Sequence, residues 1–131
     1  MSVSTCGTYQ RYSRVTCGRV SDFDWVAGAM TSGVPWVRSS GVEFDRVDAI
    51  RAVCSLPDRP DLHNHVGGPH AAMIFGLAET ASGAVGLAAF GGTAERATPL
   101  VVSSSVRYRA LARGPLTAEA VLAHSAADVL A

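Results

Sequence analysis

The sequence predicts a single α+β domain in which a long apolar helix packs against antiparallel strands. The run from Pro69 to Phe90 consists of apolar and small residues with one ionisable group, Glu79, and is long enough for about five or six helical turns. Segments in which apolar and polar residues alternate lie before and after this run, as in half-buried strands. The length of 131 residues provides one core and leaves no room for a second.

Charge and cysteine content narrow the classes of function. Lys plus Arg and Asp plus Glu both number 11, and every basic residue is Arg, so nothing favours nucleic acid as a partner. The cysteines, Cys6, Cys17 and Cys54, are odd in number and lack the spacing of a metal site. This usage fits a reducing compartment. We therefore expect a cytoplasmic protein without a metal or other cofactor.

The apolar run 71–90 also has the length of a membrane span, for which about 20 residues suffice. A charged Glu79 near its middle would cost about 2.5–3.5 kcal/mol in a bilayer. Thr80, Ser82 and several glycines lower the hydropathy further, and no basic cluster flanks the run. We therefore predict a core helix and no membrane partner.

The N-terminal part of the sequence predicts one clear helix, preceded by a segment without a clear structural pattern. Residues 1–20 are rich in Ser, Thr and Gly, contain no acid and lack the apolar region of a signal peptide, so we expect a disordered leader or a misassigned start. Ser21 then suits the cap of a short helix that ends at Gly33-Val34-Pro35. Its buried face follows helical spacing and consists of Phe23, Val26, Ala27 and Met30.

Residues 36–56 predict extended chain with one irregularity. Val42 and Phe44 alternate, and the phase of the pattern then slips around Asp45-Arg46. A bulged strand explains this slip. Beyond it, one face is shared by Ile50, Ala52, Cys54 and Leu56. The proline-containing segment 57–61 ends the strand.

Glycine and proline mark the boundaries of the long helix and of the elements after it. Gly67-Gly68 allow a tight backbone before the helix, Pro69 suits its first position and Gly91-Gly92 end it. Alternation over residues 100–110 predicts a strand. The segment 113–115 then turns the chain into a second strand over residues 116–123, beside the first and antiparallel to it.

A motif spans the start of the long helix. The chain matches the pattern Asn-x-x-Gly-x-x-His-Gly-Gly-x-x-Phe-x-Leu-Ala-Asp/Glu at Asn64, Gly67, His70, Phe75, Leu77, Ala78 and Glu79. On these residues the chain resembles the hotdog-fold acyl-CoA thioesterases, in particular the PaaI-like type and its uncharacterised bacterial relatives. The resemblance extends from about Asp22 to Ala123 and implies that residues 21–131 form a hotdog domain, with the sheet wrapped around the long helix.

The chain departs from this family in two respects. Ala71-Ala72 replace the Gly-Gly of the motif, which keeps the backbone amides but adds methyl groups where a thioester would approach. The family continues with about two further strands, so we expect the domain to be incomplete at its C-terminus. Part of the long helix would then remain uncovered.

The resemblance implies a division of roles at the site. A helix N-terminus offers unpaired amides and a positive dipole end, so the amide of Ala71 resembles the carbonyl-binding donor of the family. Glu79 is expected to act as base or nucleophile, and Asn64 to hold the water or the thioester oxygen. Gly67, His70, Ala72 and the hydroxyl-bearing Thr98 are the expected substrate-binding residues.

Each candidate also has a structural interpretation. Glu79 could bond hydroxyl groups on a neighbouring helix, and Asn64 could simply cap its loop. His63, His65 and His70 form only a weak zinc pattern, because no acid or cysteine accompanies them. Arg107, Arg109 and Arg113 could meet the phosphates of coenzyme A, although charges on a solvated strand face are the default.

Three functions follow from these features. The leading one is hydrolysis of acyl-CoA thioesters to free acid and CoA. The second is a hotdog 3-hydroxyacyl dehydratase or hydratase, because the spacing between His65 and Glu79 is similar to the His-to-Glu spacing of those enzymes. The third is a non-catalytic acyl-binding or scaffold protein, favoured by Ala71-Ala72 and the missing strands. The expected partners are acyl-CoA and further copies of the chain, as a homodimer or a dimer of dimers.

Overall fold

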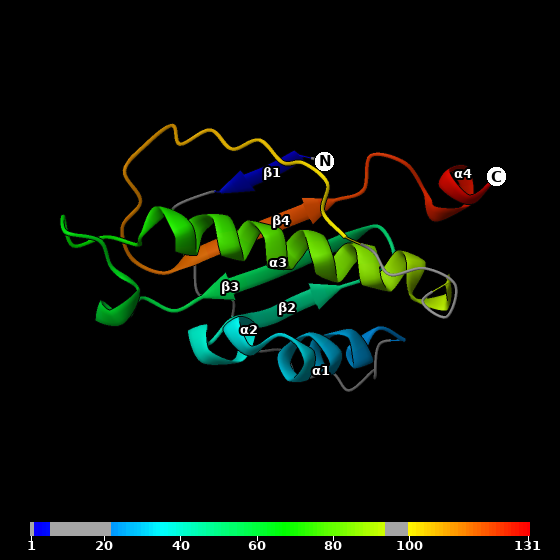
Figure 1. The fold of residues 1–131 in the computed structure, drawn as a ribbon, viewed down its shortest axis with the longest axis horizontal. Coiled ribbons are helices and arrows are strands. Elements are labelled where there is room, and N and C mark those ends of the chain that lie inside the picture. The colour runs from blue at the N-terminus through cyan, green and yellow to red at the C-terminus, as the bar shows by residue number, and fades with distance from the viewer. Residues whose placement is uncertain (1, 6–21, 94–99) are drawn as a thin grey trace.

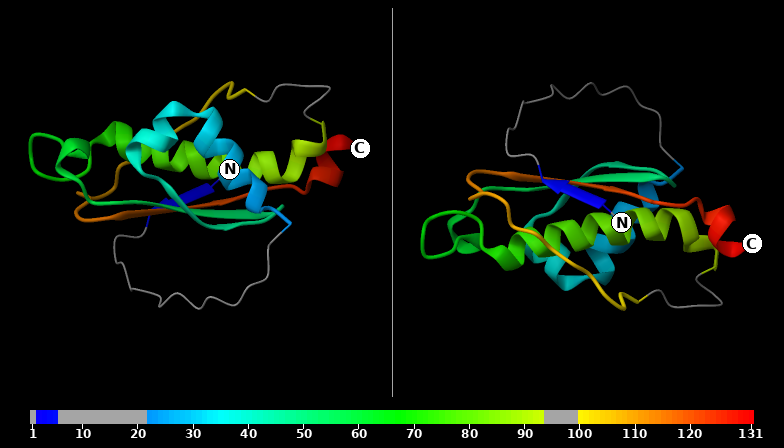
Figure 2. Two further views of the ribbon diagram at one scale, coloured as in Figure 1. Left: turned by 90° about the horizontal axis from the view of Figure 1, so that it is seen from below. Right: turned by 90° about the horizontal axis from the view of Figure 1, so that it is seen from above.

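The computed structural model of the chain describes residues 2–5, 22–93 and 100–131. A four-stranded antiparallel sheet, in the order β1-β4-β3-β2, carries the helices on one face (Figures 1 and 2). This arrangement confirms the predicted α+β class. In chain order the elements are β1 (Ser2–Thr5), α1 (Asp24–Gly33), α2 (Pro35–Ser40), β2 (Glu43–Val47), β3 (Arg51–Leu56), the 3-10 helix η1 (Pro60–Leu62), α3 (Ala71–Phe90), the 3-10 helix η2 (Gly91–Thr93), β4 (Leu116–Val121) and α4 (Ala126–Leu130).

The core lies between α3 and the two central strands. Alternate side chains of β3 and β4 face α3 and are buried, as strand geometry requires. Most of these side chains are small, so the helix approaches the sheet closely. The core residues of these three elements are Ala52, Cys54, Leu56, Leu77, Ala81, Ala84, Val85, Leu116, Ala118 and Ala120.

Only one face of α3 is covered by the chain. Residues Ala71–Thr93 are long and apolar enough to cross a membrane by length and composition, with a mean hydropathy of 1.5, and they form the one such stretch among the described residues. Of the most apolar window, 28% is buried within the chain. The remaining faces of α3 are partly or fully exposed.

Two tryptophans seat the N-terminal helices beside α3. The ring of Trp36 in α2 lies against Gly76, where an added Cβ would come within 2.7 Å of the ring. The ring of Trp25 in α1 meets Gly91 in the same way, at 2.8 Å from an added Cβ. The absence of side chains at these two glycines therefore lets α1 and α2 pack at the β2 edge of the sheet (Figure 1).

The predicted single extended segment over residues 36–56 is wrong in two places. Residues 35–40 form α2, because Pro35 suits a first helical position and Gly41, at φ 77°, provides the left-handed residue that ends a helix. The remainder is the hairpin of β2 and β3. Its turn is built by Asp48, whose Oδ1 accepts hydrogen bonds from the amides of Ile50 (2.9 Å) and Arg51 (2.8 Å).

The inner face of this hairpin and its bulge agree with the sequence pattern. Phe44 pairs with Cys54 and Arg46 pairs with Val53, which leaves Asp45 as the extra residue of the predicted bulge. Ile50 does not share the inner face, because it lies in the turn and is 64% exposed.

The predicted strand over residues 100–110 does not form. Residues 100–110 run alongside α3 without strand pairing among the described residues, and all of them are exposed (Figure 2). β4 forms as predicted but pairs with β3 and β1 instead. Alternation in sequence shows which side chains could share a face, whereas a strand also requires a partner backbone.

The N-terminal segment differs from the disordered leader expected for residues 1–20. Ser2–Thr5 form β1, which pairs antiparallel with β4. An unpaired sheet edge can accept any extended backbone, so composition alone does not reveal such a pairing. Residues 6–21, including the predicted cap Ser21, lie outside the described residues; α1 begins at Asp24 and ends at Gly33, close to the predicted limits.

Candidate functional site

The motif loop, residues 63–69, is a closed turn that delivers the chain to α3. Its ends pair as an isolated bridge between His63 and Pro69. The amide of Asn64 donates to the carbonyl of Gly68 at 2.7 Å, and the amide of His70 donates to the carbonyl of Leu62 at 2.8 Å. Gly67, at φ 73°, adopts the left-handed conformation that this turn requires.

The side chain of Asn64 is used mainly inside this loop. Its Oδ1 accepts hydrogen bonds from the amides of Val66 (3.0 Å) and Gly68 (3.3 Å). Its Nδ2 donates to the carbonyl of Pro69 at 3.4 Å, which leaves one amide proton for another acceptor. The loop-capping interpretation is therefore what the geometry of this residue supports directly.

His70 caps α3 and so decides which backbone amides are free. Its Nδ1 accepts a hydrogen bond from the amide of Ala72 at 3.0 Å, which places the ring proton of a neutral histidine on Nε2. The amide of Ala71 has no acceptor among the described residues. Pro69 precedes the cap, so the prediction that it occupies the first helical position is wrong.

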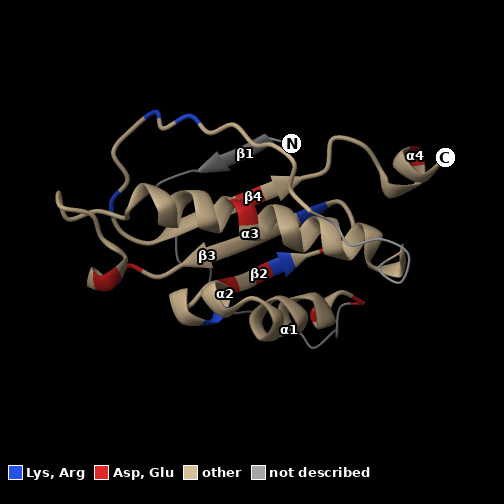
Figure 3. Cartoon of the chain, viewed as in Figure 1, with Lys and Arg blue, Asp and Glu red and all other residues tan. Residues whose placement is uncertain are grey.

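Glu79 lies on the outer face of α3, where Figure 3 shows the acidic residue at mid-helix. A core helix, as predicted from the sequence, would bury this carboxylate, but Glu79 is exposed while its neighbour Thr80 is buried. No hydroxyl group among the described residues bonds it. Within the chain, Ala71 and Glu79 are about 12 Å apart along the helix at ~1.5 Å per residue. A run that is apolar on every side does not reveal which face the sheet covers.

Sequence reasoning missed a contact between the helix start and the distant segment 107–113. The hydroxyl of Tyr108 donates to the carbonyl of Ala71 at 3.2 Å. The carbonyl oxygen of Ala112 lies 2.6 Å from the position that a Cβ on Gly68 would take. No local pattern signals either contact, because the partners are far apart in the sequence.

We expect Gly68→Ala to disturb this junction. The new methyl group would clash with a backbone oxygen, so either the motif loop or the segment 107–113 must shift. We expect this to lower the free energy of unfolding by about 1–3 kcal/mol. Urea denaturation measures this change. The matched control is Gly28→Ala in α1, where an added Cβ meets nothing within 4 Å and helix propensity should raise stability by up to about 1 kcal/mol. Equal midpoints for Gly68→Ala and the unaltered chain would contradict the close packing.

The other predicted site residues and potentially reactive side chains in the described part of the chain do not come together in one site. His63 Nε2 lies 2.6 Å from Asp58 Oδ1, a pair that sequence reasoning also missed, and His65 is exposed. No group of three potential metal ligands occurs among the described residues. Thr98 lies outside them. Burial, with a smaller contribution from Asp45, raises the pKa of the Cys54 thiol to about 12, so this thiol is not a ready nucleophile.

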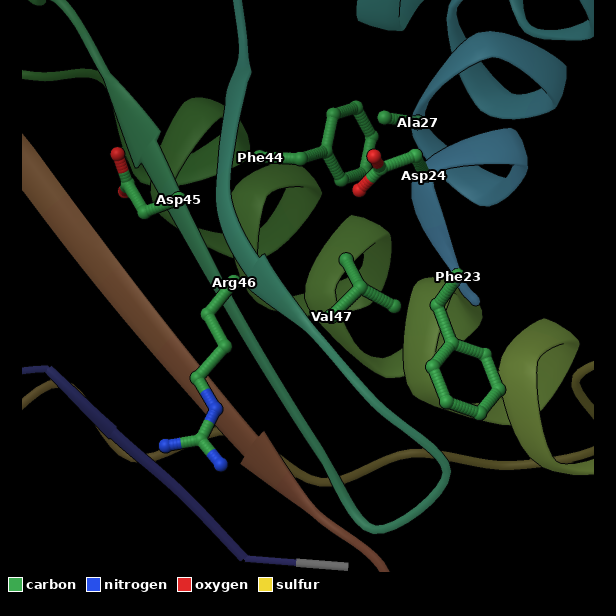
Figure 4. Close-up of a pocket in the computed structure, with 7 residues that line it drawn as sticks. All are labelled: Phe23, Asp24, Ala27, Phe44, Asp45, Arg46 and Val47. Carbon is green, nitrogen blue, oxygen red and sulfur yellow. The ribbon is translucent and has the colours of Figure 1, made fainter. Parts of the chain in front are cut away.

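A hollow of about 250 Å³ lies between α1 and β2, away from the motif loop (Figure 4). Partial burial raises the pKa of the Asp45 carboxyl group at its wall. The hollow contains none of the predicted site residues. Its lining consists of Phe23, Asp24, Ala27, Phe44, Asp45, Arg46 and Val47.

Comparison with known proteins places the chain in a family. Residues 24–129 match the family model described as a domain of unknown function, DUF4442. The chain belongs to the DUF4442 family. A comparison with curated proteins gave no match.

Solved structures show that this DUF4442 protein has the hotdog fold. A Pseudomonas aeruginosa protein of unknown function, described as a probable thioesterase, is 26% identical with a TM-score of 0.66, over 76% of this chain and 64% of its own. AziG of S. sahachiroi is 31% identical with a TM-score of 0.58, over 69% and 72%. The E. coli PaaI protein, from the phenylacetic acid degradation operon, is 20% identical with a TM-score of 0.60, over 77% and 74%. The DUF4442 chain thus spans less than two thirds of the length of the first of these proteins.

Proposed function

We propose that this protein hydrolyses acyl-CoA thioesters to a free acid and CoA. The observation that carries the proposal is the free amide of Ala71 at the start of α3, beside a motif loop that Asn64 holds in shape. Glu79 on the outer face of the same helix supplies a carboxylate. Similarity to hotdog proteins described as thioesterases supports the same class of reaction.

The chemistry follows from these groups. The Ala71 amide donates to the thioester carbonyl oxygen and stabilises the charge that develops there. Glu79 either takes a proton from the attacking water, so that loss of the CoA thiolate gives the free acid directly, or attacks the carbonyl carbon itself. On the second route the carbon–sulfur bond breaks to leave the acyl group on Glu79 as an anhydride, and water then cleaves this anhydride to give the free acid and restore the carboxylate. On both routes the thiolate of CoA leaves and is protonated. The remaining amide proton of Asn64 is available to the water or the thioester oxygen.

The separation of the groups favours a site shared between two copies of the chain. A carbonyl bound at Ala71 is too far from Glu79 of the same helix, at about 12 Å of rise, for proton transfer at ~3 Å. A second α3 running antiparallel would bring its own Glu79 to that carbonyl. The exposed outer face of α3, which includes Phe75 and Glu79, leaves room for this approach. We therefore propose a homodimer with two equivalent sites. Because its cysteine usage fits a reducing compartment, we propose that it lies in the cytoplasm.

A panel of acyl-CoA thioesters tests the proposal. We expect release of free thiol, followed with a thiol reagent, and no absorbance from an enoyl product. Enoyl formation without thiol release would instead establish the dehydratase or hydratase. Binding of acyl-CoA with neither product would establish the non-catalytic acyl-binding protein.

A further inference from the structure

Positive charge is concentrated on one segment of this electrically balanced chain. Residues 100–118 contain three arginines and no acid, whereas the formal net charge of the protein is zero. The segment and its arginines lie on the side of α3 away from β2 (Figure 3). These residues are Arg107, Arg109 and Arg113.

The three arginines are exposed and have no acidic partner among the described residues. Three of the other four described arginines do pair, with Arg46 bound to Asp48, Arg51 to Glu119 and Arg59 to Asp61. Unpaired guanidinium groups can bind phosphate in a bidentate manner without first breaking an ion pair.

The segment is fixed beside the proposed reaction site. Tyr108 contacts the carbonyl of Ala71 at 3.2 Å, and Ala112 lies against Gly68 of the motif loop. Arg107 and Arg109, the two neighbours of Tyr108 in the chain, are both exposed to solvent. Two residues of chain span at most about 7 Å, so these two arginines stay close together. Such spacing suits two phosphate groups of one ligand.

We propose that Arg107, Arg109 and Arg113 bind the phosphates of a nucleotide-bearing thioester, so that this protein selects acyl-CoA over thioesters of pantetheine alone. The proposal rests on the proposed function for the identity of the reacting group. Three cations within seven residues of one segment, next to the helix start, match a compact polyanion. Docking of an acidic carrier protein would use a much wider surface, about 800 Å² per partner.

The test measures binding separately from hydrolysis. The triple variant Arg107→Gln/Arg109→Gln/Arg113→Gln is compared with Arg38→Gln, which removes an exposed arginine on α2 that also has no ion pair in the described part of the chain. Calorimetry with free CoA, dephospho-CoA and pantetheine gives the affinities. We expect the triple variant to lose about tenfold or more in CoA affinity, less in dephospho-CoA affinity and none in pantetheine affinity. Arg38→Gln should bind all three ligands as the unaltered chain does.

The outcomes separate this proposal from the proposed function. A loss of CoA affinity in a chain that releases no thiol would support phosphate binding and refute hydrolysis. Unchanged CoA affinity in the triple variant, an equal loss for pantetheine, or no CoA binding by the unaltered chain would overturn phosphate binding. Phosphate binding would also be overturned if the triple variant bound an acyl carrier protein more weakly but bound CoA as the unaltered chain does. An unchanged thermal unfolding curve checks that the variant is folded.

Discussion

Glu79→Gln is expected to lower thiol release from acyl-CoA by about 10²–10⁴-fold. The amide keeps the shape of the side chain but cannot accept a proton at neutral pH or attack as a carboxylate. Because Glu79 is exposed and bonds no described residue, the substitution should leave both the fold and the affinity for acyl-CoA nearly unchanged. Single-turnover thiol release, together with equilibrium binding of the substrate, measures the two effects separately.

The matched control is Glu119→Gln on the outer face of β4. It removes a carboxylate that pairs with Arg51 at 2.9 Å, an exposed pair of the kind that contributes little to stability. We expect this variant to hydrolyse thioesters at the rate of the unaltered chain. Near-native hydrolysis by Glu79→Gln would remove Glu79 from the catalytic site.

Mixing two impaired variants is expected to restore activity if each site combines residues of two chains. Asn64→Ala removes the acceptor of two loop amides and should impair the site at the start of α3, whereas Glu79→Gln impairs the carboxylate. A mixed dimer then carries both lesions in one site and leaves the other site intact. With random exchange, half of the dimers are mixed, so about a quarter of all sites should be active.

The variant Asn64→Asp separates the two possible contributions of Asn64 in this experiment. It keeps oxygen acceptors for the amides of Val66 and Gly68 but has no Nδ2 donor. If Asn64→Asp is impaired alone and recovers activity on mixing with Glu79→Gln, the donor contributes beyond loop shape. Absence of recovery, after verified exchange of subunits, would mean that the site is built within one chain or that Asn64 and Glu79 serve different sites.

The sequence alone determined the features that depend on near neighbours in the chain. The C-terminal end of α3, the bulge at Asp45 and the buried face of β3 follow from helical or strand periodicity and from the glycines after the helix. The motif loop was also recognisable, because its residues stand at fixed spacings. The geometry adds that the side chain of Asn64 holds this loop by hydrogen bonds and that the side chain of His70 caps the first turn of α3.

Only the tertiary structure decided features that depend on a distant partner. Apolar and polar residues alternate over 100–110 as in a strand, but this segment has no strand partner in the described structure. Ser2–Thr5, in contrast, pair with the edge of β4. Glu79 became exposed because the sheet covers a single face of a helix that is apolar all round. The contact of Tyr108 with Ala71 joins two such distant segments. Local preference fixes the conformation of a short stretch, but burial and pairing depend on which other surfaces reach it, and only the folded chain brings those surfaces together.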